Sequence, residues 1–305
     1  MNVIGRRQKA VRANAWTACA LILAVGAGGP VVRDLPLMTL LGAYQSRSAT
    51  HTEIPFKLYG DYMIVVRGSV RGRHKVNLLI DTGSSQSVVD GCLARKLRLA
   101  RSPRNISVFG STVVTEEAAL PSLQLGSLQA APVPVVVRDL SYFRDLFSVQ
   151  VDVIVGIDIL SRGSFTVDYE ARKLILGPVE RLSNSVPCDP RFPYPTVPLR
   201  IGNRRVRVLV DTGAQDLALF ESQTRGALPG VQVVGQETRT TMRGPVVVKR
   251  AEFHELTLGT THWARREGFF MEAASNLFHG LLGPRWLGAK RIGFDLEHKV
   301  ISWEK

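Results

Sequence analysis

The tripeptide Asp-Thr-Gly occurs twice in this chain, at residues 81–83 and 211–213. In each copy the aspartate directly follows an apolar run, Leu-Leu-Ile at 78–80 and Val-Leu-Val at 208–210. Such runs are typical of strands buried on both faces, and a glycine permits a tight reversal where a side chain would clash. Each copy therefore predicts a carboxylate on a short loop at the end of a strand. Together they predict a duplicated fold in which each half supplies one carboxylate.

Three further landmarks recur in the same order after each Asp-Thr-Gly. They are a Leu-x-Leu-Gly segment at 123–126 and 256–259, an apolar run ending in glycine at 153–156 and 280–283, and a pair of β-forming segments around a charged turn at 165–176 and 293–302. Landmarks repeated in one order are the signature of a tandem repeat. Because most segments are short, rich in Val, Leu and Thr, and punctuated by glycine, the architecture is expected to be mainly β.

The repeat fixes a domain organisation. We predict a leader at 1–27, a linker or pro-segment at 28–54, an N-terminal lobe at 55–177, a connection at 178–194 and a C-terminal lobe at 195–305. The connection and its edges are rich in proline, which excludes a helix or a central strand there. Short helices are expected around residues 88–99 and after each apolar run ending in glycine.

The N-terminus has the pattern of a signal peptide. A basic start is followed by an uncharged, mostly apolar stretch at 13–27, then by small residues and Pro30. The stretch is short for a membrane span, so cleavage near Ala27 is favoured over retention as an N-terminal membrane anchor. The mature protein is expected to be exported, to the periplasm or the medium.

Charge and metal-ligand patterns exclude several functions. The formal net charge is +13, but no helical or aromatic-interleaved basic stripe accompanies it, so we expect no nucleic-acid partner. The histidines are scattered without a metal-binding motif, and we expect neither a metal nor a cofactor. Cys92 and Cys188 are the two cysteines beyond the leader, and the sequence leaves open whether they form a disulfide.

The duplicated motifs resemble those of the aspartic proteases, and the small lobes resemble the retropepsin-like branch more than the pepsin-like one. The resemblance covers almost everything after about residue 55. It implies a mainly β fold: two homologous retropepsin-like β-barrel lobes in tandem, few short helices, and an active site between the lobes. It also implies a single chain that works as a monomer, with Asp81 and Asp211 as the catalytic pair.

The resemblance assigns roles to further residues. It implies that Thr82 and Thr212 interlock the two loops and that backbone amides around Gly83 and Gly213 orient the carboxylates. The residues that follow differ between the lobes, Ser84 in the first and Ala214 in the second. The apolar runs ending in Gly156 and Gly283 resemble the family's psi-loop, which packs behind the catalytic loop of its own lobe.

Family members close over substrate with a β-hairpin flap. The candidates here are Phe109 and Gly110 in the first lobe and Gly244 in the second, and ordinary surface hairpins are equally compatible with these residues.

Two carboxylates about 3 Å apart cannot both ionise easily, so they share one proton. The ionised one can activate a water while the other donates to the scissile carbonyl, which is peptide hydrolysis without a metal. The expected function is an aspartic endopeptidase acting on peptide or protein substrates. The alternative is a non-catalytic peptide-binding protein that uses the same cleft.

Overall fold

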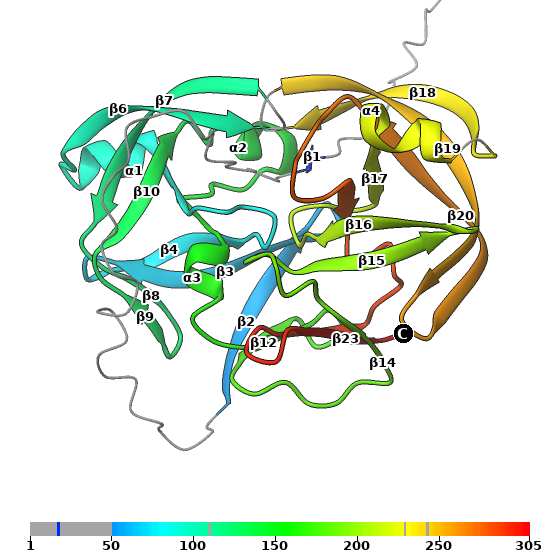
Figure 1. Cartoon of the computed structure of the whole chain (residues 1–305). Coiled ribbons are helices and arrows are strands. Elements are labelled where there is room, and N and C mark those ends of the chain that lie inside the picture. The colour runs from blue at the N-terminus through cyan, green and yellow to red at the C-terminus, as the bar shows by residue number, and fades with distance from the viewer. Residues whose placement is uncertain (1–16, 19–50, 109–110, 229, 242–243) are drawn as a thin grey trace, which may run out of the picture.

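The computed structural model describes residues 17–18, 51–108, 111–228, 230–241 and 244–305. The expected mainly β architecture is confirmed (Figure 1). The N-terminal lobe contains β2 (Thr52–Tyr59), β3 (Met63–Val70), β4 (Arg73–Ile80), β5 (Val88–Asp90), α1 (Gly91–Lys96), β6 (Arg101–Val108), β7 (Ser111–Leu120), β8 (Leu123–Leu125), β9 (Leu128–Ala130), β10 (Val133–Arg138), α2 (Tyr142–Phe147), β11 (Val153–Val155), α3 (Ile157–Leu160), β12 (Phe165–Asp168) and β13 (Lys173–Leu176).

The C-terminal lobe repeats this plan. Its elements are β14 (Asn184–Pro187), β15 (Thr196–Ile201), β16 (Arg204–Val210), β17 (Leu217–Phe220), α4 (Glu221–Thr224), a 3₁₀ turn (Arg225–Ala227), β18 (Gln232–Thr241), β19 (Gly244–Leu258), β20 (Thr261–Met271), β21 (Gly280–Leu282), β22 (Arg291–Asp295) and β23 (Val300–Glu304).

Strand pairing shows that the lobes are true repeats. In the first lobe, β11 runs parallel to β4 and antiparallel to β5, and β10 runs parallel to β5 and antiparallel to β7. In the second, β21 pairs in the same two senses with β16 and β17, and β20 with β17 and β19. The repeated order of sequence landmarks therefore reflects a repeated topology, and the prediction of two tandem lobes is confirmed.

A shared antiparallel sheet joins the lobes, in the order β14-β23-β22-β12-β13-β2. Its two central strands come from different lobes: β12 pairs with β22, which places Phe165 opposite Phe294. Their rings stack with centroids 4.8 Å apart. Both side chains are buried, so the centre of this sheet belongs to the core of both lobes.

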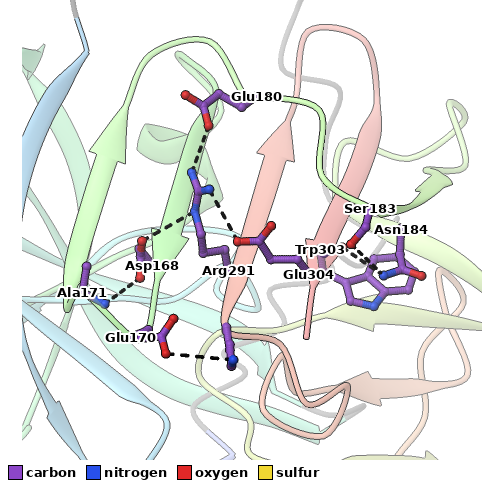
Figure 2. A network of polar contacts seen from close by, with 10 residues as sticks. Asp168, Glu170, Ala171, Glu180, Ser183, Asn184, Arg291, Trp303 and Glu304 are labelled. Carbon is purple, nitrogen blue, oxygen red and sulfur yellow. Dashed lines mark hydrogen bonds and ion pairs between the residues drawn. The ribbon is translucent and has the colours of Figure 1, made fainter.

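One arginine ties this sheet together at its surface (Figure 2). Arg291 on β22 lies within 3.5 Å of Asp168 on β12, 3.2 Å of Glu180 in the connection and 3.5 Å of Glu304 on β23. Three segments from both sides of the lobe boundary thus converge on one guanidinium.

Several local expectations need correction or completion. Strand β2 begins at Thr52, within the stretch expected to be a linker, and β14 lies within the expected connection. β14 is an edge strand, the place in a sheet where proline is tolerated. A short helix does follow Gly156, but the segment after Gly283 forms successive turns instead, ending at Gly288, whose φ is +73°.

Two residues of the expected leader, Thr17–Ala18, are among the described residues. They form β1 and pair in parallel with Thr240 and Thr241 of β18. No helix within the described ranges is both long enough and apolar enough to span a membrane.

The two cysteines beyond residue 27 do not form a disulfide in this structure. Cys92 is exposed and Cys188 is buried, and both are free thiols.

Candidate active site

Each Asp-Thr-Gly loop begins where a buried central strand ends. β4 pairs with β11 up to Ile80 opposite Val155, and the Asp81 N–H then donates to the Val155 carbonyl at 3.1 Å. In the second lobe the Asp211 N–H donates to the Leu282 carbonyl at 3.0 Å. The parallel partner strand therefore fixes the backbone from which each carboxylate projects.

Both carboxylates are wholly buried. Oδ1 of Asp81 accepts from the N–H groups of Gly83 at 2.9 Å and Ser84 at 3.1 Å, and Oδ1 of Asp211 accepts from the Gly213 N–H at 2.7 Å. Oδ2 of each carboxylate accepts no hydrogen bond from an N–H or hydroxyl group of the described residues. Each aspartate thus has one oxygen held by its own loop and one left for chemistry.

The two loops meet face to face. A Cβ atom at Gly83 would lie 2.4 Å from Cγ of Asp211 and 2.5 Å from both of its oxygens. Real side-chain atoms do not approach so closely, so only glycine allows the backbone of the first loop to reach the carboxylate of the second.

The threonines lock the loops together. The Thr82 hydroxyl donates to the Val210 carbonyl at 2.8 Å and accepts from the Thr212 N–H at 3.0 Å. The Thr212 hydroxyl mirrors this, donating to the Ile80 carbonyl at 2.9 Å and accepting from the Thr82 N–H at 3.1 Å. These four buried hydrogen bonds all cross between the lobes, in the arrangement that the resemblance implied.

The glycines predicted to lie behind the loops also do so. A Cβ at Gly156 would lie 2.7 Å from the Ser84 carbonyl oxygen, and one at Gly283 would lie 2.4 Å from that of Ala214. Each glycine therefore packs against the catalytic-loop candidate of its own lobe.

Comparison with known families agrees with this geometry. A family model described as aspartyl protease matches the chain twice, over residues 66–159 and 197–286. The chain belongs to the aspartyl protease family. No curated protein matches the sequence. The two matched segments each contain one Asp-Thr-Gly loop and its packing glycine, so each of the two tandem lobes matches the family by itself.

In this member of the family the two carboxyl groups perturb each other's pKa. Burial and the neighbouring Asp211 carboxylate raise the pKa of Asp81 well above its ordinary value. Burial also raises the pKa of Asp211, against the opposing effect of the Gly213 N–H. Two buried carboxyls without a cation between them favour the state in which a proton is shared.

The lobes support their loops differently. In the first lobe, Asp158 lies two residues after Gly156, and its carboxylate accepts from the Ser87 hydroxyl at 2.8 Å and from the Ser87 N–H at 3.1 Å. The Gly156 N–H donates to the same Ser87 hydroxyl. The second lobe has Leu217 and Arg285 at the matching positions. Arg285 reaches across to the first lobe, where its guanidinium lies 3.5 Å from Asp61 and over the Tyr169 ring at 5.3 Å.

Two long hairpins, β6–β7 and β18–β19, run along the upper edge of Figure 1, and the candidate Gly244 lies at the tip of the second. Gly244 begins β19 with φ +97° and pairs with Thr241. Phe109 and Gly110 lie outside the described residues. The hairpins are confirmed as structure, and their role as flaps stays a prediction.

A pocket opens beside the Asp211 loop, under the β18–β19 hairpin. It is lined by Ala214, Gln215, Asp216, Ala218, Arg239, Thr241, Val246, Val248, Phe269, Met271 and Leu281. Of these the sequence singled out only Ala214 as a site residue. The others lie on a loop, on β17, on the two hairpin strands and on β20 and β21, and no local pattern relates those positions.

The part of the chain that the structure describes contains no cluster of three or more His, Cys, Asp or Glu side chains that could hold a metal ion.

Proposed function

We propose that this protein is an aspartic endopeptidase in which Asp81 and Asp211 together activate a water molecule. The observation that carries the proposal is the pair of fully buried carboxylates on interlocked loops, each with one oxygen held by backbone N–H groups and one unengaged by donors of the described residues. The glycine contact at Gly83 brings the two loops close enough for both carboxylates to act on one substrate.

The mechanism follows from the shared proton. The ionised carboxylate removes a proton from the water as it attacks the scissile carbonyl carbon, and the protonated carboxyl donates to the carbonyl oxygen. The tetrahedral species then collapses as a proton passes to the leaving nitrogen. Thr82 and Thr212 act as positioning residues because their hydrogen bonds fix the two loops relative to each other.

A non-catalytic peptide-binding protein is the second candidate. Burial of two neighbouring carboxyls without a cation costs free energy, and a cleft that only binds peptide gains nothing from that cost. Retention of both aspartates, together with both threonines and both glycines, therefore favours catalysis.

We also propose that the enzyme is exported and works as a monomer on peptide or protein substrates. Residues 1–27 have the signal-peptide pattern, and both aspartates belong to one chain. The N-terminal residue of protein recovered from an exporting host tests this proposal. Cleavage near Ala27 supports it, and recovery of the intact leader in the membrane fraction supports anchoring instead.

The activity test uses an unfolded protein substrate between pH 3 and 7, with a statine-type transition-state mimic as inhibitor. Asp81→Asn and Asp211→Asn should each lower the cleavage rate by at least about a thousandfold, since neither half of the pair works alone. Asp145→Asn, an exposed aspartate on α2, is the matched control and should cleave like the wild type. If both dyad variants also cleave like the wild type, the dyad assignment is wrong. If the wild-type protein binds the mimic but cleaves no substrate, the result supports the non-catalytic peptide-binding protein.

A further inference from the structure

The first lobe carries an excess of positive charge at one end. Between residues 62 and 100 the chain has seven Lys and Arg residues but only two acidic residues, Asp81 and Asp90. Both aspartates are buried, so the exposed charge of this stretch is positive. The cations come from the β3–β4 hairpin and from α1 and its end, on the side of Figure 1 away from the C-terminal lobe.

Hydrogen bonds join the hairpin to the helix. The Arg71 guanidinium donates to the Leu97 carbonyl at 2.9 Å. The Arg67 guanidinium donates to the Lys75 carbonyl at 2.7 Å. The hairpin tip stands in open space, since a Cβ at Gly72 would meet no atom within 4 Å. Six exposed cations of these two segments form what we call the basic patch: Arg67, Arg71, Arg73, Lys75, Lys96 and Arg98.

Little negative charge opposes the basic patch. Among the described residues none of its six cations forms an ion pair with a carboxylate. Asp152 lies near Lys96 and Arg67, whose charges oppose the effect of burial on its pKa. Its carboxylate is partly buried and accepts from the Asn77 N–H at 2.8 Å. Six exposed cations therefore face one partly buried carboxyl group, and the patch keeps a positive charge.

Three of the six cations occupy backbone positions that favour glycine. Arg71 lies in the β3–β4 turn with φ +48°, Lys75 is the extra residue of a bulge in β4 with φ +62°, and Arg98 follows the end of α1 with φ +53°. Glycine is the usual residue at the left-handed position of such turns, bulges and helix ends. Local structure therefore does not account for cations at these positions.

The surroundings of the basic patch favour lipid headgroups over a protein or a nucleic acid. A protein interface has an apolar or aromatic centre, and single-stranded nucleic acid stacks on exposed aromatic rings. The one aromatic residue between 62 and 100, Tyr62, is buried. The exposed large apolar side chains of the described residues lie elsewhere, at Val114, Val234 and Val247. Anionic headgroups need only cations on a protruding surface.

We propose that the basic patch docks this protein onto a membrane surface rich in anionic phospholipid. Attraction between the cations and the phosphate groups attaches the protein reversibly, without insertion into the bilayer. Strand β4 begins in the patch at Arg73 and ends directly before Asp81, so the carboxylate lies about 25 Å along the strand from the patch. The docked protein is thus held at the membrane with its aspartate pair clear of the lipid.

The test measures co-sedimentation of the full chain with vesicles of phosphatidylcholine alone, or with about 30% phosphatidylglycerol added. We expect more protein on the anionic vesicles at about 0.05 M NaCl, and a difference that disappears at about 0.5 M because salt screens the attraction. Residues 1–27 are the same in every variant, so a comparison between variants isolates the patch.

Matched double variants remove equal charge from the two lobes. Lys75→Gly/Arg98→Gly should weaken binding to the anionic vesicles about tenfold or more, and glycine suits both backbone positions. The control is Arg204→Gln/Arg205→Gln, which changes two exposed residues on the equivalent β15–β16 hairpin of the second lobe. It should bind within about twofold of the wild type, since attraction fades beyond a Debye length from the surface.

A second patch variant keeps the test decisive if the glycine variant does not fold. Arg73→Gln/Lys96→Gln removes two patch cations whose backbone φ is negative. It should weaken binding to the anionic vesicles to the same degree as Lys75→Gly/Arg98→Gly.

Three results would overturn the proposal. The wild type binds neutral and anionic vesicles equally, or the control loses as much binding as the patch variants, which makes net charge the cause. In the third, a DNA duplex of about 20 base pairs binds more tightly than the vesicles and only the patch variants lose it, which assigns the patch to nucleic acid. Vesicle binding is measured without a peptide substrate, so failure of the proposed peptidase function leaves this test unaffected.

Discussion

Among single residues, the buried aspartates place a cost on the folded state that depends on pH. Folding raises the pKa of Asp81, so the folded protein binds that proton more tightly than the unfolded chain does. The resulting stabilisation is present at low pH and is lost as the pH rises from the unfolded-state pKa through the folded-state pKa. At neutral pH, where both carboxyls are ionised in the unfolded chain, the buried pair therefore destabilises the fold on which its chemistry depends.

Replacement of the acid by its neutral isostere should relieve this cost. At pH 7, Asp81→Asn should unfold about 2–8 °C above the wild type, since 1 kcal/mol corresponds to roughly 2–4 °C in a protein of this size. The gap should close as the pH falls toward 3.5. Thermal unfolding followed by circular dichroism across this pH range measures it, with Asp145→Asn as a control that shows no gap. An Asp81→Asn protein less stable than wild type at pH 7 contradicts the prediction.

Sequence reasoning works at this scale where a residue's role is local. Asp81, Thr82 and Gly83 stand in one short motif at the end of one strand, so strand, turn and carboxylate could be predicted together. Asp216 and Arg239 could not be assigned in this way. They meet in a pocket only because β18 folds back over the Asp211 loop, and that approach depends on tertiary structure.

Among elements, the stability of the β12–β22 pairing, which joins the two lobes, depends on Arg291. Arg291→Ala leaves Asp168, Glu180 and Glu304 without their common cation and should lower the free energy of unfolding by about 1–2 kcal/mol. Urea unfolding measures the loss. Arg101→Ala, which removes a more exposed pair with Glu116 on the β6–β7 hairpin, should lower it by less than about 0.5 kcal/mol. Equal effects of the two substitutions would show that the Arg291 network is only a surface feature.

The elements that sequence reasoning missed pair over long distances. β14 lies in a proline-rich stretch and has few local marks of a strand, but β23 offers it an unpaired edge. Conversely, the expected helix after Gly283 does not form. The N–H groups of Trp286, Leu287 and Gly288 each donate to the carbonyl three residues earlier, which makes successive turns. In the equivalent segment after Gly156, the N–H groups of Leu160 and Ser161 donate to the carbonyl four residues earlier, as in an α-helix.

In the whole molecule, neither lobe is complete alone. The threonine hydrogen bonds cross the lobe boundary, β12 and β22 share one sheet, and a single buried apolar cluster includes Phe165 of the first lobe and Phe294 of the second. The duplication visible in the sequence predicted two lobes, but local patterns do not reveal how much of each lobe's core the other completes.

Such coupling predicts that the two lobes unfold together. The three tryptophans after residue 27, Trp263, Trp286 and Trp303, are all buried in the C-terminal lobe, so in a chain that begins at residue 28 tryptophan fluorescence reports on that lobe alone. Far-ultraviolet circular dichroism reports on strands of both lobes. In that chain the two signals should give coincident thermal transitions. Phe165→Ala removes one ring of the Phe165–Phe294 stack between β12 and β22. It should lower the midpoints of the fluorescence and circular dichroism transitions or separate the two transitions. Two resolved transitions in the unmodified protein would mean that the lobes fold independently, and that the Asp81–Asp211 pair forms only when two stable lobes dock.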